Sequence, residues 1–437
     1  MPRLVMLVWA LSLSGAFINA GEAPAPGAPD AERIKVIISN LVGEDPELRN
    51  AAKKQLSDLG EAALPQLKEA RANQKEGPGV AALDEIIASA GPLGVLWTAS
   101  LVDDANGANA ENVRVIPPLV HKDRVVVQSV RSLRGLNLSD GREAWTEQVY
   151  GEGGVAAANG RVFALQNMSE LRAYDIANGK KVWTTSHQGY VVAAVTVCGE
   201  RVLVAASGNH VADFQIKNGD PVWTFRADDA FSAAPAMEGE RFYCGAKNGK
   251  FYGASLKSGK KVWEFDVGAD LPTPPLVAGG KVFVANAEGK LFAFNAEDGK
   301  KLWDVSPGGS LRNALAIYDG KLLVVSREGA LSALKIEDGS AAWSVKLPGG
   351  GSFTNPVAAG GKIFAGSDGL VSMHDAKTGE KLGEFKTGES GAVLLALAGK
   401  YLIVNTATKT FALRSGVKGP EEWPQIGGNP GHTGAGE

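Results

Sequence analysis

The stretch PPLVAGGKVFVANAEGKLFAFNAEDGKKLWDV, which runs from Pro274 to Val305, decides the fold. Its apolar runs have the length of β-strands, and short glycine-rich turns separate them, which predicts four antiparallel strands. In the last turn, Gly299 supplies the positive φ that a tight turn needs, and Asp298 before it can hydrogen-bond the local backbone. We therefore interpret the stretch as one four-stranded antiparallel sheet.

The turn that ends this stretch recurs along the chain at a nearly constant spacing. Its glycine stands at positions 141, 179, 219, 259, 299, 339 and 379, a first step of 38 residues followed by five steps of 40. A tryptophan follows four residues after each glycine except the last, where TGEKLG ends in Gly383. A repeat of this length with four strands predicts a β-propeller with one blade per repeat.

The tryptophans have a predicted structural role. Ten residues before five of them stands a small residue, which leaves space for an indole to lie flat between two sheets: Gly135, Ala173, Gly253, Ala293 and Ala333. Because the seventh copy lacks the indole, we expect Gly383 to mark the weakest contact between blades. We predict that the following tryptophans dock each blade on the next: Trp97, Trp145, Trp183, Trp223, Trp263, Trp303 and Trp343.

The two ends of the repeat region complement each other. Trp97, in GVLWTASL, has the character of a fourth strand without a repeat before it, whereas Ala392 to Gly416 holds three strands and no matching tryptophan. If the N-terminal strand forms the outer edge of the last blade, the ring has seven complete blades and one composite blade. We thus predict an all-β, eight-bladed propeller of four-stranded antiparallel blades, which the N-terminal strand closes.

The pattern Ala-x-Asp-x-x-Asn-Gly-x-x-x-Trp, from Ala173 to Trp183, resembles the tryptophan-docking motif of the pyrroloquinoline-quinone (PQQ) repeat family. The resemblance covers roughly Val95 to Gly416, and the signatures of WD-repeat and kelch propellers are missing. It implies either a quinone-dependent dehydrogenase or a non-enzymatic propeller similar to the assembly subunit of the outer-membrane β-barrel machinery. The segment from Trp423 to Gly434 resembles one that often precedes the first blade in related proteins.

The N-terminal part of the chain has a different character from the repeats. Arg3, an apolar run and small residues up to Ala20 form the pattern of a signal peptide, and the apolar run is too short for a membrane span. No cysteine lies near the cleavage point, so we expect a periplasmic or secreted protein without a stable membrane span. The predicted segments are 1–20 signal peptide, 21–29 linker, 30–91 helical domain, 92–418 propeller and 419–437 C-terminal tail.

Residues 30–91 have helical spacing. Asp45 is a predicted N-cap and Gly60 a predicted helix stop, and the run from Asp45 to Ala70 resembles a HEAT-like helical repeat. This small α-helical domain is either a capping bundle that packs on the propeller or a module that binds a partner.

Charge and cysteine content limit the possible functions. The net charge is −3, with 45 basic and 48 acidic residues that are scattered along the chain, so nucleic acid is not an expected partner. Cys198 and Cys244 fall at non-equivalent positions of neighbouring blades. A disulfide between them is possible, but we expect free buried thiols.

The enzyme branch of the family implies a vicinal cysteine pair, a Ca²⁺ ion held by carboxylate and amide oxygens, and a catalytic aspartate. The two cysteines here are not adjacent, and the five histidines show no metal-binding spacing. A calcium site needs about 6 to 8 oxygen ligands, whereas each inter-blade loop holds one or two polar groups of interest. These are Glu152, His187, Asp228, Asp229, Asp270, Arg312 and Glu389. We predict no catalytic residue, no cofactor and no metal.

We therefore predict a non-catalytic scaffold that binds a protein or another component of the cell envelope. Arg312 is the strongest candidate for a recognition residue, since arginine is favoured at binding hot spots, although a plain solvent-facing loop would look the same. The alternatives are a PQQ- and Ca²⁺-dependent alcohol or sugar dehydrogenase and a polysaccharide-binding or sensor module. The residues of the predicted binding face are Arg312, Asp228, Asp229, Asp270 and His187.

Overall fold

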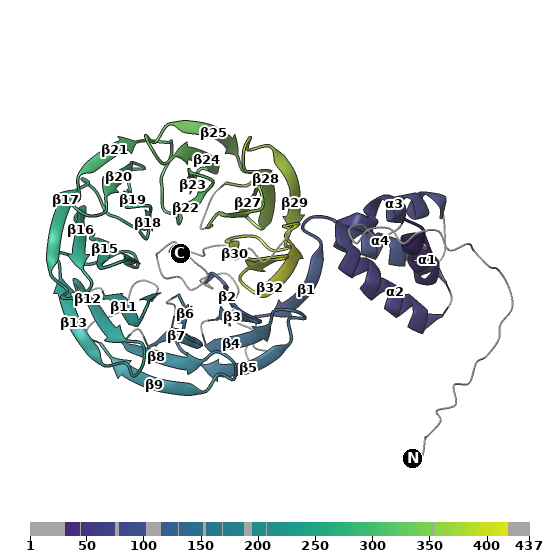
Figure 1. The fold of residues 1–437 in the computed structure, drawn as a ribbon, viewed down its shortest axis with the longest axis horizontal. Coiled ribbons are helices and arrows are strands. Elements are labelled where there is room, and N and C mark those ends of the chain that lie inside the picture. The colour runs from purple at the N-terminus through teal and green to yellow at the C-terminus, as the bar shows by residue number, and fades with distance from the viewer. Residues whose placement is uncertain are drawn as a thin grey trace, which may run out of the picture.

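The computed structural model describes residues 31–43, 45–74, 78–101, 115–129, 131–151, 154–167, 169–187, 195–206, 208–350 and 354–417. Within these ranges, four α-helices precede 32 strands that form eight four-stranded sheets arranged in a ring (Figure 1). The predicted signal peptide, the linker, the C-terminal tail and Glu152 lie outside the described residues.

Seven blades are continuous in sequence and run from the innermost to the outermost strand (Figure 1). The first four blades are β2 (Leu119–His121), β3 (Arg124–Gln128), β4 (Ser132–Asn137) and β5 (Glu143–Gln148); β6 (Ala156–Ala158), β7 (Arg161–Gln166), β8 (Glu170–Asp175) and β9 (Lys181–Ser186); β10 (Thr196–Cys198), β11 (Arg201–Ala206), β12 (His210–Gln215) and β13 (Pro221–Arg226); β14 (Ala236–Glu238), β15 (Arg241–Gly245), β16 (Lys250–Ser255) and β17 (Lys261–Asp266). The next three are β18 (Leu276–Ala278), β19 (Lys281–Ala285), β20 (Leu291–Asn295) and β21 (Lys301–Val305); β22 (Ala316–Tyr318), β23 (Lys321–Val325), β24 (Ala330–Lys335) and β25 (Ala341–Lys346); β26 (Val357–Ala359), β27 (Lys362–Ser367), β28 (Leu370–Asp375) and β29 (Lys381–Lys386).

The eighth blade is composite, and it closes the ring. Its strand order is β1-β32-β31-β30, where β1 is Val95–Ser100, β32 is Lys409–Arg414, β31 is Tyr401–Asn405 and β30 is Leu394–Ala398. Trp97 of β1 lies opposite Ala412 of β32 in an antiparallel pair. The predicted eight-bladed propeller closed by an N-terminal strand is confirmed.

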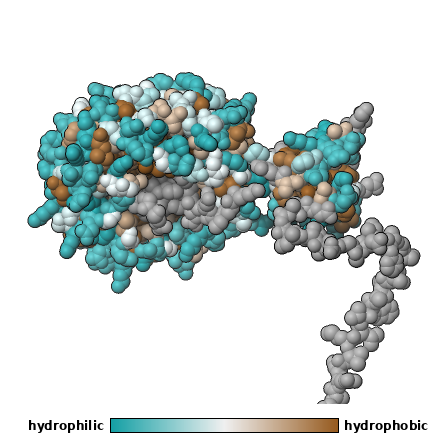
Figure 2. Space-filling model, turned by 45° about the horizontal axis from the view of Figure 1, so that its top comes forward, coloured by the Kyte–Doolittle hydropathy of each residue, from teal (hydrophilic) through white to brown (hydrophobic). Residues whose placement is uncertain are grey.

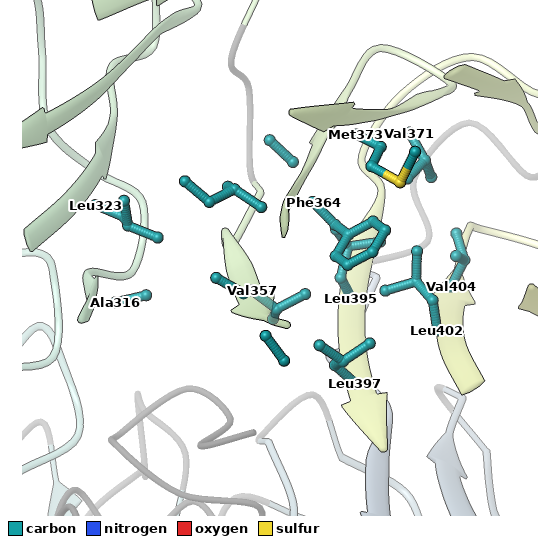
Figure 3. Packing of buried hydrophobic residues seen from close by; sticks show 14 of the residues in the cluster. Ala316, Leu323, Val357, Phe364, Val371, Met373, Leu395, Leu397, Leu402 and Val404 are labelled. Atoms are coloured by element: carbon teal, nitrogen blue, oxygen red, sulfur yellow. The ribbon is translucent and has the colours of Figure 1, made fainter. Parts of the chain in front are cut away.

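Apolar side chains from adjacent blades pack into a chain of clusters around the ring. One large cluster extends from the sixth blade to the eighth and includes Val357 of β26, Phe364 of β27 and Leu395 of β30 (Figure 3). Burial of apolar area between sheets is the main force that holds such layers together. The blades are therefore joined through their faces, so the loops rest on a rigid base.

The helical unit lies outside the ring, next to β1 (Figure 1). It comprises α1 (Ala31–Val42), α2 (Pro46–Leu59), a 3₁₀ turn (Gly60–Ala63), α3 (Leu64–Asn73) and α4 (Pro78–Ala90), which bury one shared apolar core. Asp45 caps α2, because its carboxylate accepts hydrogen bonds from the amides of Glu47 at 2.8 Å and Leu48 at 3.3 Å. Gly60 ends α2 with a positive φ of 54°. No helix in the described ranges is long and apolar enough to cross a membrane.

Candidate functional site

The antiparallel topology sorts the connections onto two faces of the ring. The connections between blades and the turns between second and third strands share one face, which we call the loop face. The turns between first and second strands and between third and fourth strands share the opposite face, which we call the turn face. All five residues of the predicted binding face lie in connections between blades and therefore on the loop face.

Asp228 and Asp229 lie in the connection between β13 and β14. The exposed Asp228 carboxylate forms an ion pair with Lys250 of β16, whose ammonium group lowers the pKa of that carboxyl. Asp229 accepts a hydrogen bond from the amide of Ala230 at 2.7 Å. Both carboxylates therefore already have partners within this chain.

Asp270 joins two neighbouring loops. It lies between β17 and β18, and its Oδ1 accepts a hydrogen bond of 2.7 Å from Ser232 Oγ in the connection between β13 and β14. Its backbone carbonyl accepts from the amide of Ala287 at 2.8 Å. Asp270 thus stiffens the loop face across the contact between the fourth and fifth blades.

Arg312 is exposed on a loop that is anchored on both sides. Leu311 before it is buried, and Asn313 after it donates to the carbonyl of Val325 at 3.0 Å and accepts from the amide of Thr354 at 3.1 Å. The backbone on either side of Arg312 is therefore held in place in the free protein, which lowers the entropic cost of ordering this loop on binding. His187 is half-buried at the end of β9, where its amide donates to the carbonyl of Ser169 at 3.1 Å.

The structure places these residues on four different connections. Asp228, Asp229 and Asp270 are near one another, whereas Arg312 and His187 belong to other blade contacts. Glu389, on a further connection, accepts a hydrogen bond of 2.6 Å from Thr408 Oγ1. In the part of the chain that the structure describes, no group of three or more His, Cys, Asp or Glu side chains has the arrangement to hold a metal ion. Cys198 and Cys244 are free thiols, and burial raises the pKa of both; Cys244 is buried as predicted, whereas Cys198, at the end of β10, is only half-buried.

The seven tryptophans predicted to dock the blades all lie at contacts between successive blades. Each indole Nε1 donates to a backbone carbonyl of the next blade, and the indole lies against the glycine of that blade's last turn, as Trp145 does with Gly179. These hydrogen bonds run from Trp97 to Leu138 (2.9 Å), Trp145 to Ile176 (2.9 Å), Trp183 to Ile216 (3.0 Å), Trp223 to Leu256 (2.7 Å), Trp263 to Ala296 (3.3 Å), Trp303 to Ile336 (3.2 Å) and Trp343 to Ala376 (3.2 Å).

One buried ion pair was not predicted from the sequence. Asp213 occupies the position ten residues before Trp223, where other blades have Gly or Ala, and its side chain is 0% exposed. It accepts a hydrogen bond of 3.0 Å from Arg201 Nε, and the guanidinium lies over the Trp223 ring at 6.0 Å from its centroid. The break in the small-residue pattern at Asp213 was the available signal. A buried carboxylate requires such a partner.

The family model described as outer membrane protein assembly factor BamB matches residues 148–270 and 226–425 of this chain. The matched region holds five of the six glycine–tryptophan turns and most of the ring. The chain belongs to this family. The resemblance to PQQ-type repeats is thereby confirmed.

Individual relatives agree with the BamB family match. The BamB protein of Alkalilimnicola ehrlichii is 31% identical over 90 residues, which cover 20% of this chain and 24% of the relative, so the chain spans about a quarter of that protein's length. The crystal structure of BamB from Moraxella catarrhalis superposes with a TM-score of 0.60 at 19% identity and covers 72% of this chain and 98% of that one. The quinohemoprotein alcohol dehydrogenase of Comamonas testosteroni gives 0.59 at 15% identity, over 76% and 78% of the two chains. At such identities the likeness to these two structures shows the fold alone.

Proposed function

We propose that the protein is a non-catalytic scaffold of the bacterial envelope that binds another protein through its loop face and acts in outer membrane protein assembly. Membership in the BamB family is the observation that carries this proposal. The same membership supports a periplasmic or secreted location and a protein partner.

The chemistry of the loop face supports a binding role. The carboxylates of Asp228, Asp229 and Asp270 bind the ammonium group of Lys250, the amide of Ala230 and the hydroxyl of Ser232, which stabilises the face. Arg312 is exposed on this rigid surface. Arginine on a preorganised surface suits a planar acceptor such as a carboxylate of a partner protein.

The experiment compares two charge reversals on opposite faces. The full mature chain, its Arg312→Glu variant and its Lys257→Glu variant are immobilised, and the envelope proteins that they retain are quantified by mass spectrometry. Lys257 is the matched control, because it is exposed in the turn between β16 and β17 on the turn face. We expect a discrete set of proteins whose retention falls at least about fivefold with Arg312→Glu and is unchanged with Lys257→Glu.

Equal retention by the two variants would contradict a role of the loop face. The dehydrogenase alternative is tested on the same protein by adding PQQ and Ca²⁺ and measuring dye-linked oxidation of alcohols and sugars. Turnover in that assay would overturn the non-catalytic assignment.

A further inference from the structure

A cleft of about 560 Å³ lies between the helical unit and the outer edge of the closing blade. Lys53, Lys54 and Glu85 line it from the helices, and Val95, Leu96 and Phe385 line it from the ring. Its size falls within the range of roughly 300 to 1,000 Å³ that ligand sites span. Figure 2 shows apolar surface both on the helical unit and on the ring beside it.

Arg414 of β32 fixes the two walls of this cleft relative to each other. Its Nε donates to the carbonyl of Ser89 near the end of α4 at 3.3 Å, and its guanidinium also bonds the carbonyl of Ser57 near the end of α2. Carbonyls at helix C-termini lack helical partners and carry negative partial charge, so they favour a cation. The backbone adds two bonds, from Leu93 to the Arg414 carbonyl at 2.9 Å and from Arg414 to the Gly94 carbonyl at 2.8 Å.

One wall of the cleft is the open edge of a β-sheet. The strand order places β1 at the end of its sheet, with β32 on its inner side. The backbone groups on the outer side of an edge strand are available to another extended chain. The first residues of β1 line the cleft, and Val95 among them is 38% exposed. This edge therefore offers both backbone pairing and an apolar contact.

The helical wall is positively charged at the cleft. Lys53 Nζ pairs with Glu85 Oε2 at 2.5 Å, whereas Lys54 is exposed and has no ion-pair partner among the described residues. An acidic side chain of a bound segment would complement Lys54. Phe385 of β29, half-buried against Phe411, supplies an apolar surface opposite.

We propose that the cleft binds an extended segment of a partner protein, which pairs with the open edge of β1. An apolar side chain of the segment packs against Val95 and Phe385, and an acidic side chain forms an ion pair with Lys54. This site is separate from the loop face. The two proposals are therefore independent, and an experiment can contradict one of them without affecting the other.

The experiment selects 12-residue peptides from a random display library on the full mature chain. The enriched peptides are then synthesised, and their affinities are measured by fluorescence anisotropy against the wild type, Lys54→Glu, Arg312→Glu and Lys257→Glu. We expect peptides with alternating apolar residues and at least one Asp or Glu. Their affinity should fall at least about fivefold with Lys54→Glu, because an attractive charge pair becomes repulsive, and should stay unchanged with the two control variants.

A second measurement tests the pairing with β1 without relying on a variant. Amide hydrogen exchange of the wild type with and without the best peptide should show added protection over Val95–Ser100 and no change over β17, an outer strand across the ring from the helical unit (Figure 1). The absence of enriched peptides, equal affinity for the wild type and Lys54→Glu, or unchanged exchange at β1 would each overturn the proposal.

Discussion

Two blade contacts differ in how a large side chain is placed opposite a small residue. They are the contact between the fourth and fifth blades and the contact between the seventh and eighth blades. In the first, Trp263 lies opposite Gly253 in the register of β16 and β17, and the missing side chain of Gly253 leaves room for the indole. In the second, Met373 lies opposite Gly383 in the register of β28 and β29. The large residue is therefore on the third strand and the small residue on the fourth, the reverse of the first contact.

The exchange has a structural cause. Trp263 rests on Gly299, in the turn that connects the third and fourth strands of the next blade. The eighth blade has no such turn, because its third and fourth strands, β32 and β1, come from opposite ends of the ring sequence. Leu93 takes that place with a positive φ of 62°, and Met373 and Leu93 are the neighbours of Gly383.

The contacts around Gly383 favour a different expectation, namely that this blade contact is as well packed as the others. Met373 and Leu93 belong to the large apolar cluster that joins the last three blades. Lys362 Nζ adds a hydrogen bond of 2.8 Å to the carbonyl of Gly416 in the eighth blade, and Asn355 exchanges two hydrogen bonds with the backbone of Leu395. Apolar side chains and hydrogen bonds from other positions therefore contribute to the blade contact that lacks the indole.

The largest expected effect is the loss of an indole. Trp263→Ala should lower the free energy of unfolding by about 3 to 5 kcal/mol, since it leaves a cavity between two blades that cannot fully collapse. Chemical denaturation followed by circular dichroism measures this. Val262→Ala is the control, because Val262 is 47% exposed, and it should change stability by less than about 0.5 kcal/mol. Equal losses in the two variants would contradict the docking role of the tryptophan.

A smaller effect is expected from restoring the missing indole. Gly383→Trp should destabilise by about 1 to 3 kcal/mol, because Met373 already occupies the space. Adding Met373→Gly in the same chain should recover part of that loss, which a double-mutant cycle detects as a favourable coupling energy. Strictly additive losses would show that the two positions do not share one volume.

The smallest effect concerns pH. His374 of β28 is buried, with ring nitrogens 2.9 Å from the Gly379 carbonyl and 3.0 Å from Ser372 Oγ, and burial lowers its pKa below the ordinary 6.5. The unfolded chain therefore takes up a proton first as pH falls below about 6.5, so stability decreases there by at most about 1.4 kcal/mol per pH unit. In His374→Gln this part of the pH dependence should vanish. An unchanged slope between wild type and variant would rule out His374 as its source.

The ring could be predicted from the sequence because the glycine–tryptophan turn recurs at a nearly constant spacing. The spacing of Gly141 to Gly379 sets the blade count, and the unmatched Trp97 indicates the composite closure. The blade count follows from local turn chemistry, and the composite closure follows from the tendency of folds to pair or cover exposed strand edges. HEAT-like spacing likewise located the helices, since Asp45 and Gly60 act on their immediate neighbours.

The side-chain partners could not be predicted in the same way. Asp228 pairs with Lys250 and Asp270 with Ser232 only because adjacent blades bring their loops together, and no periodic pattern encodes those distances. The sequence shows that Met373 stands where most other blades have Gly or Ala. How Met373 packs, however, depends on Leu93, which lies 280 residues away in the sequence. Contacts between distant segments need the fold before they can be inferred.

Amide hydrogen exchange tests most directly the claim that the seventh and eighth blades pack as closely as the fourth and fifth. Peptides that cover β28 and β29 should exchange as slowly as those that cover β16 and β17, because each pair forms the third and fourth strands of a blade that is closely packed on the next one. Faster exchange confined to β28 and β29 would contradict the claim and would restore Gly383 as the weak point of the ring.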